Sequence, residues 1–257
     1  MDSPTRRDFR AFDSVFVILV LFLLLLFLGL ALPKATPPAW LMAAAAVTLP
    51  IGVVLGIWIR RRSVGAVLAP GRFTPGLVGW TVFGSAGLFL ALMSLAQPFL
   101  ELFPKYKDEI EELTREVGSM PPGFALLMIG VLAPLGEEMV FRGALLKGFR
   151  NSWGAIAGLL VSSTLFALAH GIPPRMIATF LIGMWLGGLA MRTGGLAIPL
   201  LAHALNNTLV LAYMYLELPQ LAPVFAAPGA VAFLFAAWRL FRPDERSMQG
   251  SAPPGAS

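Results

Sequence analysis

The stretch "GFALLMIGVLAPLGEEMVFRGALL", residues 123–146, decides how this chain folds. Its length and apolar content predict a membrane-spanning helix, which needs roughly 20 mainly apolar residues. Three ionisable residues, Glu137, Glu138 and Arg142, nevertheless stand inside it. Each such charge costs roughly 2.5–3.5 kcal/mol at the centre of an inserted helix. A group of three therefore predicts polar partners on other helices, a chemical role, or both.

The composition of the whole chain also indicates a membrane protein. Of its 257 residues, 57% are hydrophobic and 13% are charged, and the mean hydropathy is +0.78. Soluble domains carry about 25% charged residues. We therefore predict an all-α polytopic membrane protein with about eight transmembrane helices and a polar site buried among spans 4 to 7. The predicted spans are 14–32, 39–59, 76–96, 123–146, 153–169, 176–191, 195–216 and 222–241.

Composition also argues against several other classes of protein. The chain has no cysteine, which excludes disulfides, thiolate metal ligands and a thiol nucleophile. Its net charge of +5 comes without the interleaved basic and aromatic residues typical of nucleic-acid binding, so we expect no nucleic-acid partner. In a membrane protein the basic residues mainly set orientation.

The predicted spans divide the chain into three parts. Residues 1–120 hold three spans and, near 104–118, apolar residues at helical spacing that predict an amphipathic segment on the outer side. Residues 121–216 form the core with the polar site. Residues 217–257 hold the final span and a tail, "PDERSMQGSAPPGAS", with too little apolar content to pack, which we expect to be disordered.

The N-terminal segment "SPTRRDFRAFDSVF", residues 3–16, resembles a twin-arginine export signal. The apolar run that follows is rich in leucine and has no clear A-x-A cleavage site, so we interpret it as a retained first helix.

Basic residues predict how the chain is oriented in the membrane. With the N-terminus inside, the inner segments hold Arg6, Arg7, Arg10, Arg60, Arg61, Arg62, Arg72, Lys147, Arg150, Arg192, Arg239, Arg242 and Arg246. The outer segments hold only Lys34, Lys105, Lys107, Arg115 and Arg175. This asymmetry favours an integral protein of a prokaryotic plasma membrane with both termini in the cytoplasm.

Helical geometry separates the three ionisable residues into a pair and a single carboxylate. Glu138 and Arg142 are four residues apart, with the acid nearer the N-terminus, which is the favourable order for an ion pair along one helix face. Glu137 lies about 100° around the helix from Glu138 and so can point elsewhere. The carboxylate of Glu137 is therefore available for a chemical role.

The two histidines of the chain, His170 and His203, both stand in apolar segments. A lone intramembrane histidine often only links helices by a hydrogen bond. Together with Glu137 and nearby asparagines, however, they supply the parts for hydrolysis. A carboxylate or an imidazole in an apolar pocket can take a proton from water, and a histidine or an asparagine can stabilise an oxyanion. Serine catalysis by Ser162 or Ser163 fits less well, because no nucleophile-elbow motif is present.

These residues resemble the motifs of the CPBP (Abi) family of intramembrane proteases, which includes the type II CAAX prenyl endopeptidases. The three motifs stand here as Glu137-Glu138-x-x-x-Arg142, Phe166-x-x-x-His170 and His203-x-x-x-Asn207. The resemblance covers about residues 123–212. It implies that Glu137 and His170 activate the attacking water and that His203 and Asn207 stabilise the oxyanion. It further implies that Glu138 and Arg142, with Phe166 of the second motif, support the site.

The involvement of a metal stays open at this stage. Glu137, His170 and His203 form a set that can bind catalytic zinc, with water in the fourth position. A mechanism in which Glu137 activates water without a metal is equally compatible with the spacing. The cofactor is accordingly either a divalent metal such as zinc or none.

The depths of the two histidines in the predicted helices disagree. At about 1.5 Å per residue, His203 lies roughly 12 Å from the inner end of its helix, and His170 roughly 25 Å from the inner end of the preceding one. A tilt of about 20° recovers only a few ångströms of this difference. The two depths agree only if the helices tilt or the fifth helix begins below its predicted boundary.

Together these features predict an endopeptidase that acts within the membrane on a membrane-associated peptide or protein. Two other classes stay open: a non-catalytic scaffold or immunity protein of the same family, and a proton-coupled transporter. The transporter is less favoured because the sequence lacks a clear inverted repeat.

Overall fold

The computed structural model describes residues 8–33, 36, 38–217 and 223–242, and this part of the chain contains helices and connecting loops but no β-strand. The α-helices are α1 (Ala11–Ala31), α2 (Pro38–Ile59), α3 (Val64–Val67), α4 (Pro75–Glu101), α5 (Lys107–Gly118), α6 (Pro122–Ala125), α7 (Ala133–Glu138), α8 (Lys147–Trp153), α9 (Ala155–Leu168), α10 (Pro173–Thr193), α11 (Ala197–Tyr215) and α12 (Ala226–Phe241). Two π-helical segments, Leu126–Leu132 and Met139–Leu146, join α6, α7 and α8 into one continuous helix. The 3₁₀ turns are Pro104–Tyr106 and Pro223–Phe225.

By length and composition, seven helices in the described residues are able to cross a membrane: Ala11–Ala31, Trp40–Ile59, Pro75–Glu101, Pro122–Trp153, Pro173–Thr193, Ala197–Tyr215 and Pro223–Phe241. Large apolar side chains such as Phe27, Leu30 and Trp58 are exposed on the outside of these helices. An outer surface of this kind needs a lipid environment. The prediction of an all-α polytopic membrane protein is confirmed.

The expected fifth span, 153–169, differs from its prediction. The chain reverses at Gly154, whose φ is +89°, and α9 is only 14 residues long. At about 1.5 Å per residue it extends about 21 Å, less than the roughly 30 Å apolar core of a bilayer. The next predicted span, 176–191, is longer than expected and forms the 21-residue helix α10.

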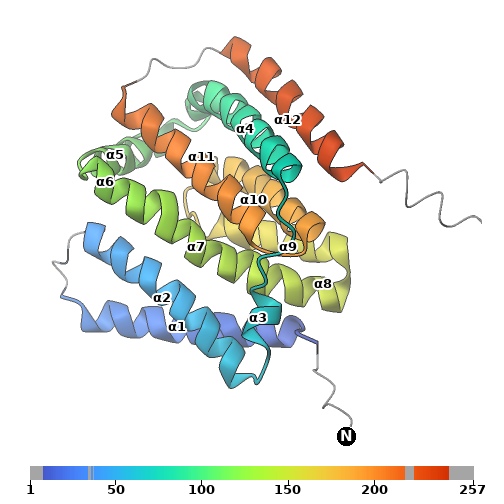
Figure 1. The fold of residues 1–257 in the computed structure, drawn as a ribbon. Helices are drawn as coiled ribbons and strands as arrows, with labels where there is room; N and C mark the ends of the chain where they lie inside the picture. The colour runs from blue at the N-terminus through green and yellow to red at the C-terminus, as the bar shows by residue number, and fades with distance from the viewer. Residues whose placement is uncertain (1–7, 34–35, 37, 218–222, 243–257) are drawn as a thin grey trace, which may run out of the picture.

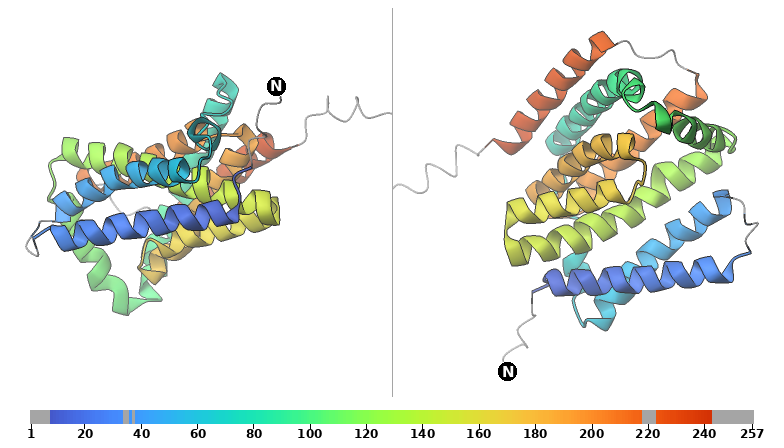
Figure 2. Two further views of the ribbon diagram at one scale, coloured as in Figure 1. Left: turned by 90° about the horizontal axis from the view of Figure 1, so that it is seen from below. Right: turned by 180° about the vertical axis from the view of Figure 1, so that it is seen from behind.

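The long helix Pro122–Trp153 lies in the middle of the bundle (Figure 1). The α1–α2 pair packs on one side of it, while α4 and α12 pack against each other on the far side, with α10 and α11 between them and the long helix (Figures 1 and 2). A small cluster of buried apolar residues, Met120, Ala125 and Leu211, lies between α11 and the start of the long helix. The two larger clusters lie among α1, α2 and the long helix and among α4, α10, α11 and α12. The polar residues of the long helix lie between these two clusters.

The start of α1 and the end of α12 lie at the same end of the bundle (Figure 1). The turns that follow α2 and α10 are at this end too, and with them most of the described basic residues that we assigned to the inner side. The basic residues Arg6, Arg7 and Arg246 lie outside the described residues, as do much of the export-signal-like segment and the tail 243–257. The opposite end holds α5, at the place where the outer amphipathic segment is expected.

The two π-helical segments of the long helix flank Pro134. Proline has no backbone N–H, so the regular α-helical bonding pattern is broken at this point. Side chains of three neighbouring helices donate to carbonyls of the π segments. Ser14 Oγ of α1 donates to Ala144 O (2.9 Å), Ser162 Oγ of α9 to Phe141 O (2.8 Å) and Asn207 Nδ2 of α11 to Ile129 O (2.9 Å). The irregular backbone thus docks the surrounding helices.

The return of α9 along α8 depends on a glycine. A Cβ added at Gly158 would lie 2.6 Å from the backbone N of Arg150 and 2.8 Å from its Cα. We expect Gly158→Ala to push α9 away from α8 and to lower the free energy of unfolding by about 1–3 kcal/mol, the usual cost of overpacking. Denaturant unfolding of the purified protein measures this. Gly79→Ala in α4, where an added Cβ meets nothing within 4 Å, is the matched control, and an equal effect of both variants would contradict the prediction.

Candidate active site

The buried centre of the site is an ion pair extended by a histidine. Oε1 of Glu138 accepts hydrogen bonds from Arg142 Nη1 and from His203 Nδ1, both at 2.8 Å. The side chains of Glu138 and Arg142 are each 1% exposed. Because an ionised carboxylate only accepts hydrogen bonds, Nδ1 of His203 is the donor in its contact with Glu138. The pair expected from i,i+4 spacing is present, and α11 supplies a third member.

Glu137 lies beside this network in a different environment. Its side chain is 24% exposed, and its Oε2 lies 3.7 Å from Nε2 of His203, beyond hydrogen-bond distance. Among the described residues Oε2 has no hydrogen-bond partner. Glu138 Oε2 also lacks one, and both of these oxygens are buried, but the other oxygen of Glu138 already accepts two donors. Glu137 is therefore the carboxylate that is free to hold a water molecule or a substrate group.

His170 comes to the site from the end of α9. Its Nδ1 lies 2.8 Å from the carbonyl oxygen of Phe166. A carbonyl only accepts, so Nδ1 carries the hydrogen and Nε2 keeps its lone pair. His170 also interacts electrostatically with Glu137 and His203. The structure therefore gathers both histidines and Glu137 in one region, without a direct hydrogen bond between His170 and Glu137.

Phe166 holds several of these groups in place. Its ring lies edge-on to the rings of His170 (centroids 4.8 Å apart) and His203 (5.6 Å). The guanidinium carbon of Arg142 lies 4.4 Å from its centroid, within cation–π range. Phe166 is fully buried, so it fixes three polar side chains from three helices against one apolar surface.

Asn207 lies one turn beyond His203 on α11, on the same helix face. One of its amide hydrogens is used in the bond to Ile129 O, and its Oδ1 accepts a hydrogen bond from Asn206 Nδ2 at 3.4 Å. An amide nitrogen has two hydrogens, so Asn207 keeps a second donor. The sequence motif places Asn207 near the site, but its docking role toward the long helix was not foreseen.

The site has two further residues that sequence reasoning missed or assigned differently. Arg175, at the start of α10, interacts electrostatically with Glu137 and His170; the signal was the cation in "HGIPPR", which we counted only toward orientation. Ser162 is one of the two serines that the sequence offers as a less suitable nucleophile. Its hydroxyl donates to Phe141 O, which makes it a docking residue.

The three residues considered as zinc ligands do not form a metal-binding group. Within the described part of the chain, no three histidine or acidic side chains are arranged to hold a metal ion. Nδ1 of His170 is engaged by a carbonyl and Nδ1 of His203 by Glu138, so only Nε2 of each ring is left to bind a metal. As placed here, Glu137, His170 and His203 do not fit a zinc ion, and we derive no step through one.

Comparisons with known proteins agree with the motifs. Residues 120–209 match the family model described as type II CAAX prenyl endopeptidase Rce1-like. A 24.3 kDa protein of Escherichia coli, described as uncharacterized, is 35% identical over 148 residues. The alignment covers 54% of this chain, and the chain spans 63% of that relative's length. No solved structure matches the chain. Residues 120–209 of the chain are thus similar to the type II CAAX prenyl endopeptidase family.

Proposed function

We propose that this protein is an intramembrane endopeptidase that hydrolyses a peptide bond with water activated by Glu137. The observation that carries the proposal is the contrast between two adjacent carboxylates. Glu138 is buried and bonded to both Arg142 and His203. Glu137 is partly exposed, has an oxygen without a hydrogen-bond partner and faces His203. The similarity of residues 120–209 to a family of endopeptidases supports the same assignment.

The position of Glu137 supports a substrate located in the membrane. Glu137 lies at the midpoint of a 32-residue helix, roughly 22 Å from either end at about 1.5 Å per residue. A peptide bond must therefore enter between the helices to reach it. This geometry favours a substrate that is a membrane-associated peptide or protein.

In the proposed reaction, Glu137 takes a proton from water while the water oxygen attacks the carbonyl carbon of the peptide bond. A C–O bond forms, and the carbonyl electron pair moves onto the oxygen. When this intermediate collapses, the C–N bond breaks, and the proton passes from Glu137 to the leaving nitrogen. The products are a carboxylic acid and an amine. Nε2 of His170 accepts a hydrogen from the same water and so orients it.

His203 and Asn207 are the residues that we assign to the oxyanion. They lie one turn apart on α11. His203 uses Nδ1 in its bond to Glu138 and keeps Nε2, and Asn207 uses one hydrogen of Nδ2 in its bond to Ile129 O and keeps the other. Nε2 of His203 donates when the ring carries both hydrogens, and Asn207 offers its second amide hydrogen. The pair of Glu138 and Arg142 holds His203 in this orientation.

We further propose that the end of the bundle rich in basic residues faces the cytoplasm. The start of α1, the end of α12 and the turns that follow α2 and α10 lie at this end (Figure 1). Arg60 directly follows α2, and Arg192 stands in the last turn of α10. Arg72 N donates to Thr193 O, so these basic residues belong to the same end. Cytoplasmic loops carry an excess of lysine and arginine. Both termini are then cytoplasmic, in the plasma membrane of a prokaryotic cell.

The test of this function is a comparison of protein termini in membranes from cells that produce the wild-type protein or Glu137→Gln. We expect at least one new terminus, within or next to a membrane segment, only with the wild type. Glu101→Gln, an exposed carboxylate at the end of α4, is the matched control and should behave as the wild type.

Identical termini with the wild type and Glu137→Gln, at equal amounts of inserted protein, would contradict the proposal. If Glu137→Gln also preserved the cellular phenotype, the result would favour a non-catalytic scaffold or immunity protein.

A further inference from the structure

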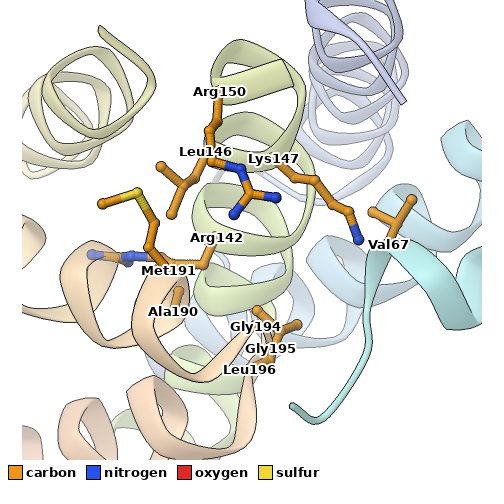
Figure 3. A pocket seen from close by; sticks show the side chains of 10 residues that line it. All are labelled: Val67, Arg142, Leu146, Lys147, Arg150, Ala190, Met191, Gly194, Gly195 and Leu196. Atoms are coloured by element: carbon orange, nitrogen blue, oxygen red, sulfur yellow. The ribbon is translucent and has the colours of Figure 1, made fainter. Parts of the chain in front are cut away.

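A small pocket lies at the basic end of the bundle, away from the groups assigned to hydrolysis. Its volume is about 50 Å³, compared with roughly 10–15 Å³ for a site that holds one water molecule. Figure 3 shows its lining: Arg142, Lys147 and Arg150 of the long helix, with Val67 of α3 and the turn Gly194–Leu196 opposite them. It therefore has room for a small polar group.

The charge of this pocket is positive. Three cations line it, and no carboxylate does. Lys147 donates to Ala66 O, and Lys147 and Arg150 repel each other electrostatically. Arg150 reaches into the ring of lining residues (Figure 3), and no side-chain hydrogen bond or ion pair is found for it within the described chain. An anion in the pocket relieves this repulsion.

Arg142 lines the pocket with a guanidinium that is already engaged elsewhere. Its side chain is 1% exposed, and its Nη atoms donate to Glu138 and to the carbonyl of Gly183. Its Nε has no hydrogen-bond partner among the described residues, but the atom is itself buried. The donors that the pocket offers to a ligand are therefore those of Lys147 and Arg150 (Figure 3).

Two loops form the floor of the pocket, and hydrogen bonds between them fix its shape before any ligand binds. Leu196 N donates to Ala69 O (2.9 Å), and Arg72 N donates to Thr193 O (2.8 Å). The backbones touch so closely that a Cβ added at Gly195 would lie 2.2 Å from the N of Gly71. The turn between α10 and α11 is therefore held in place, and binding needs little ordering of the backbone.

We propose that this pocket binds the phosphate group of an anionic phospholipid. Phosphate offers several acceptor oxygens and negative charge, which suit arginine and lysine donors. The pocket opens at the end of the bundle where the basic residues gather, and basic pockets between membrane helices on the cytoplasmic side are suited to anionic headgroups. Binding here is a property separate from hydrolysis, because the pocket residues other than Arg142 lie outside the proposed catalytic site.

The experiment measures lipid binding, so its failure is distinct from a failure of the proposed protease function. The protein is placed in phosphatidylcholine nanodiscs with increasing phosphatidylglycerol, and bound phosphatidylglycerol is counted by native mass spectrometry. We expect saturable binding of at least one molecule to the wild type. Arg150→Gln should weaken it about fivefold, the effect of one cation near a membrane surface, while Arg150→Lys should retain most of it.

Two further arms locate the site and identify the ligand. Arg239→Gln, on α12 at the same end but stacked on Trp80 (5.3 Å), should bind like the wild type. Equal affinity of Arg150→Gln and the wild type would overturn the proposal. Inorganic phosphate added to phosphatidylcholine nanodiscs should not saturate the pocket. If it did so and phosphatidylglycerol added nothing, the ligand would be free phosphate, and the lipid proposal would be overturned.

Discussion

Arg142→Met is expected to lower the free energy of unfolding by about 3–5 kcal/mol, because it leaves a buried carboxylate without its counter-charge. Glu138 and Arg142 are both 1% exposed and 2.8 Å apart. With Arg142 removed, only the hydrogen bond from His203 stays on the buried Glu138. Denaturant unfolding in a fixed detergent measures the loss. A change below about 0.5 kcal/mol, as for an ordinary surface substitution, would contradict the prediction.

A double-mutant cycle separates the interaction energy of the ion pair from the effects of removing each side chain. Glu138→Gln together with Arg142→Met removes both charges, so we expect the double variant to be more stable than Arg142→Met alone. The matched control is the exposed pair of Glu112 and Arg115, 3.3 Å apart on α5. Its variant Arg115→Met should leave stability unchanged, since exposed ion pairs contribute little.

His203→Ala is expected to reduce the rate of peptide cleavage by about 10²- to 10³-fold, the usual cost of removing one oxyanion donor. His203 lies between the two carboxylates, at 2.8 Å from Glu138 and 3.7 Å from Glu137. Its removal takes away the oxyanion donor that we assign to Nε2. The measurement is the cleavage rate of the reconstituted protein, with thermal unfolding recorded in parallel.

The control for this prediction is folding. Glu138 keeps its bond to Arg142 in His203→Ala, so the variant should stay inserted and folded. A cleavage rate equal to that of the wild type would show that His203 has no part in the reaction. A fully unfolded variant would show that the histidine mainly supports the structure.

The fold class and the long central helix could be predicted from the lengths of the apolar segments alone. The positions of the neighbouring helices along the axis of the long helix could not. Leu196, just before α11, reaches the long helix near Gly143, while α9 meets it at Arg150. The inner end of α9 therefore lies roughly 10 Å further along the long helix than that of α11. This offset removes most of the predicted disagreement between the depths of His170 and His203. The offset depends on where the chain turns at Gly154, and the pattern of apolar residues does not indicate this position.

The candidate site was predictable where its contacts are local in sequence. The spacing of Glu138 and Arg142 on one helix predicted their ion pair, and the contact of Phe166 with His170 has the same i,i+4 origin. The contacts between helices were not predictable. The bond of His203 to Glu138 and that of Asn207 to Ile129 O depend on how α11 is aligned with the π-helical segments.

Single-turnover hydrolysis of a peptide that spans an identified cleavage site tests the role of Glu137 most directly. The wild type, Glu137→Gln and the control Glu101→Gln are compared in lipid, and the wild type is also assayed after treatment with a zinc chelator. We expect Glu137→Gln to lose at least about 10²-fold in rate, with the control and the chelator-treated wild type unchanged. A rate for Glu137→Gln equal to that of the wild type would contradict the assignment of Glu137 as the catalytic base.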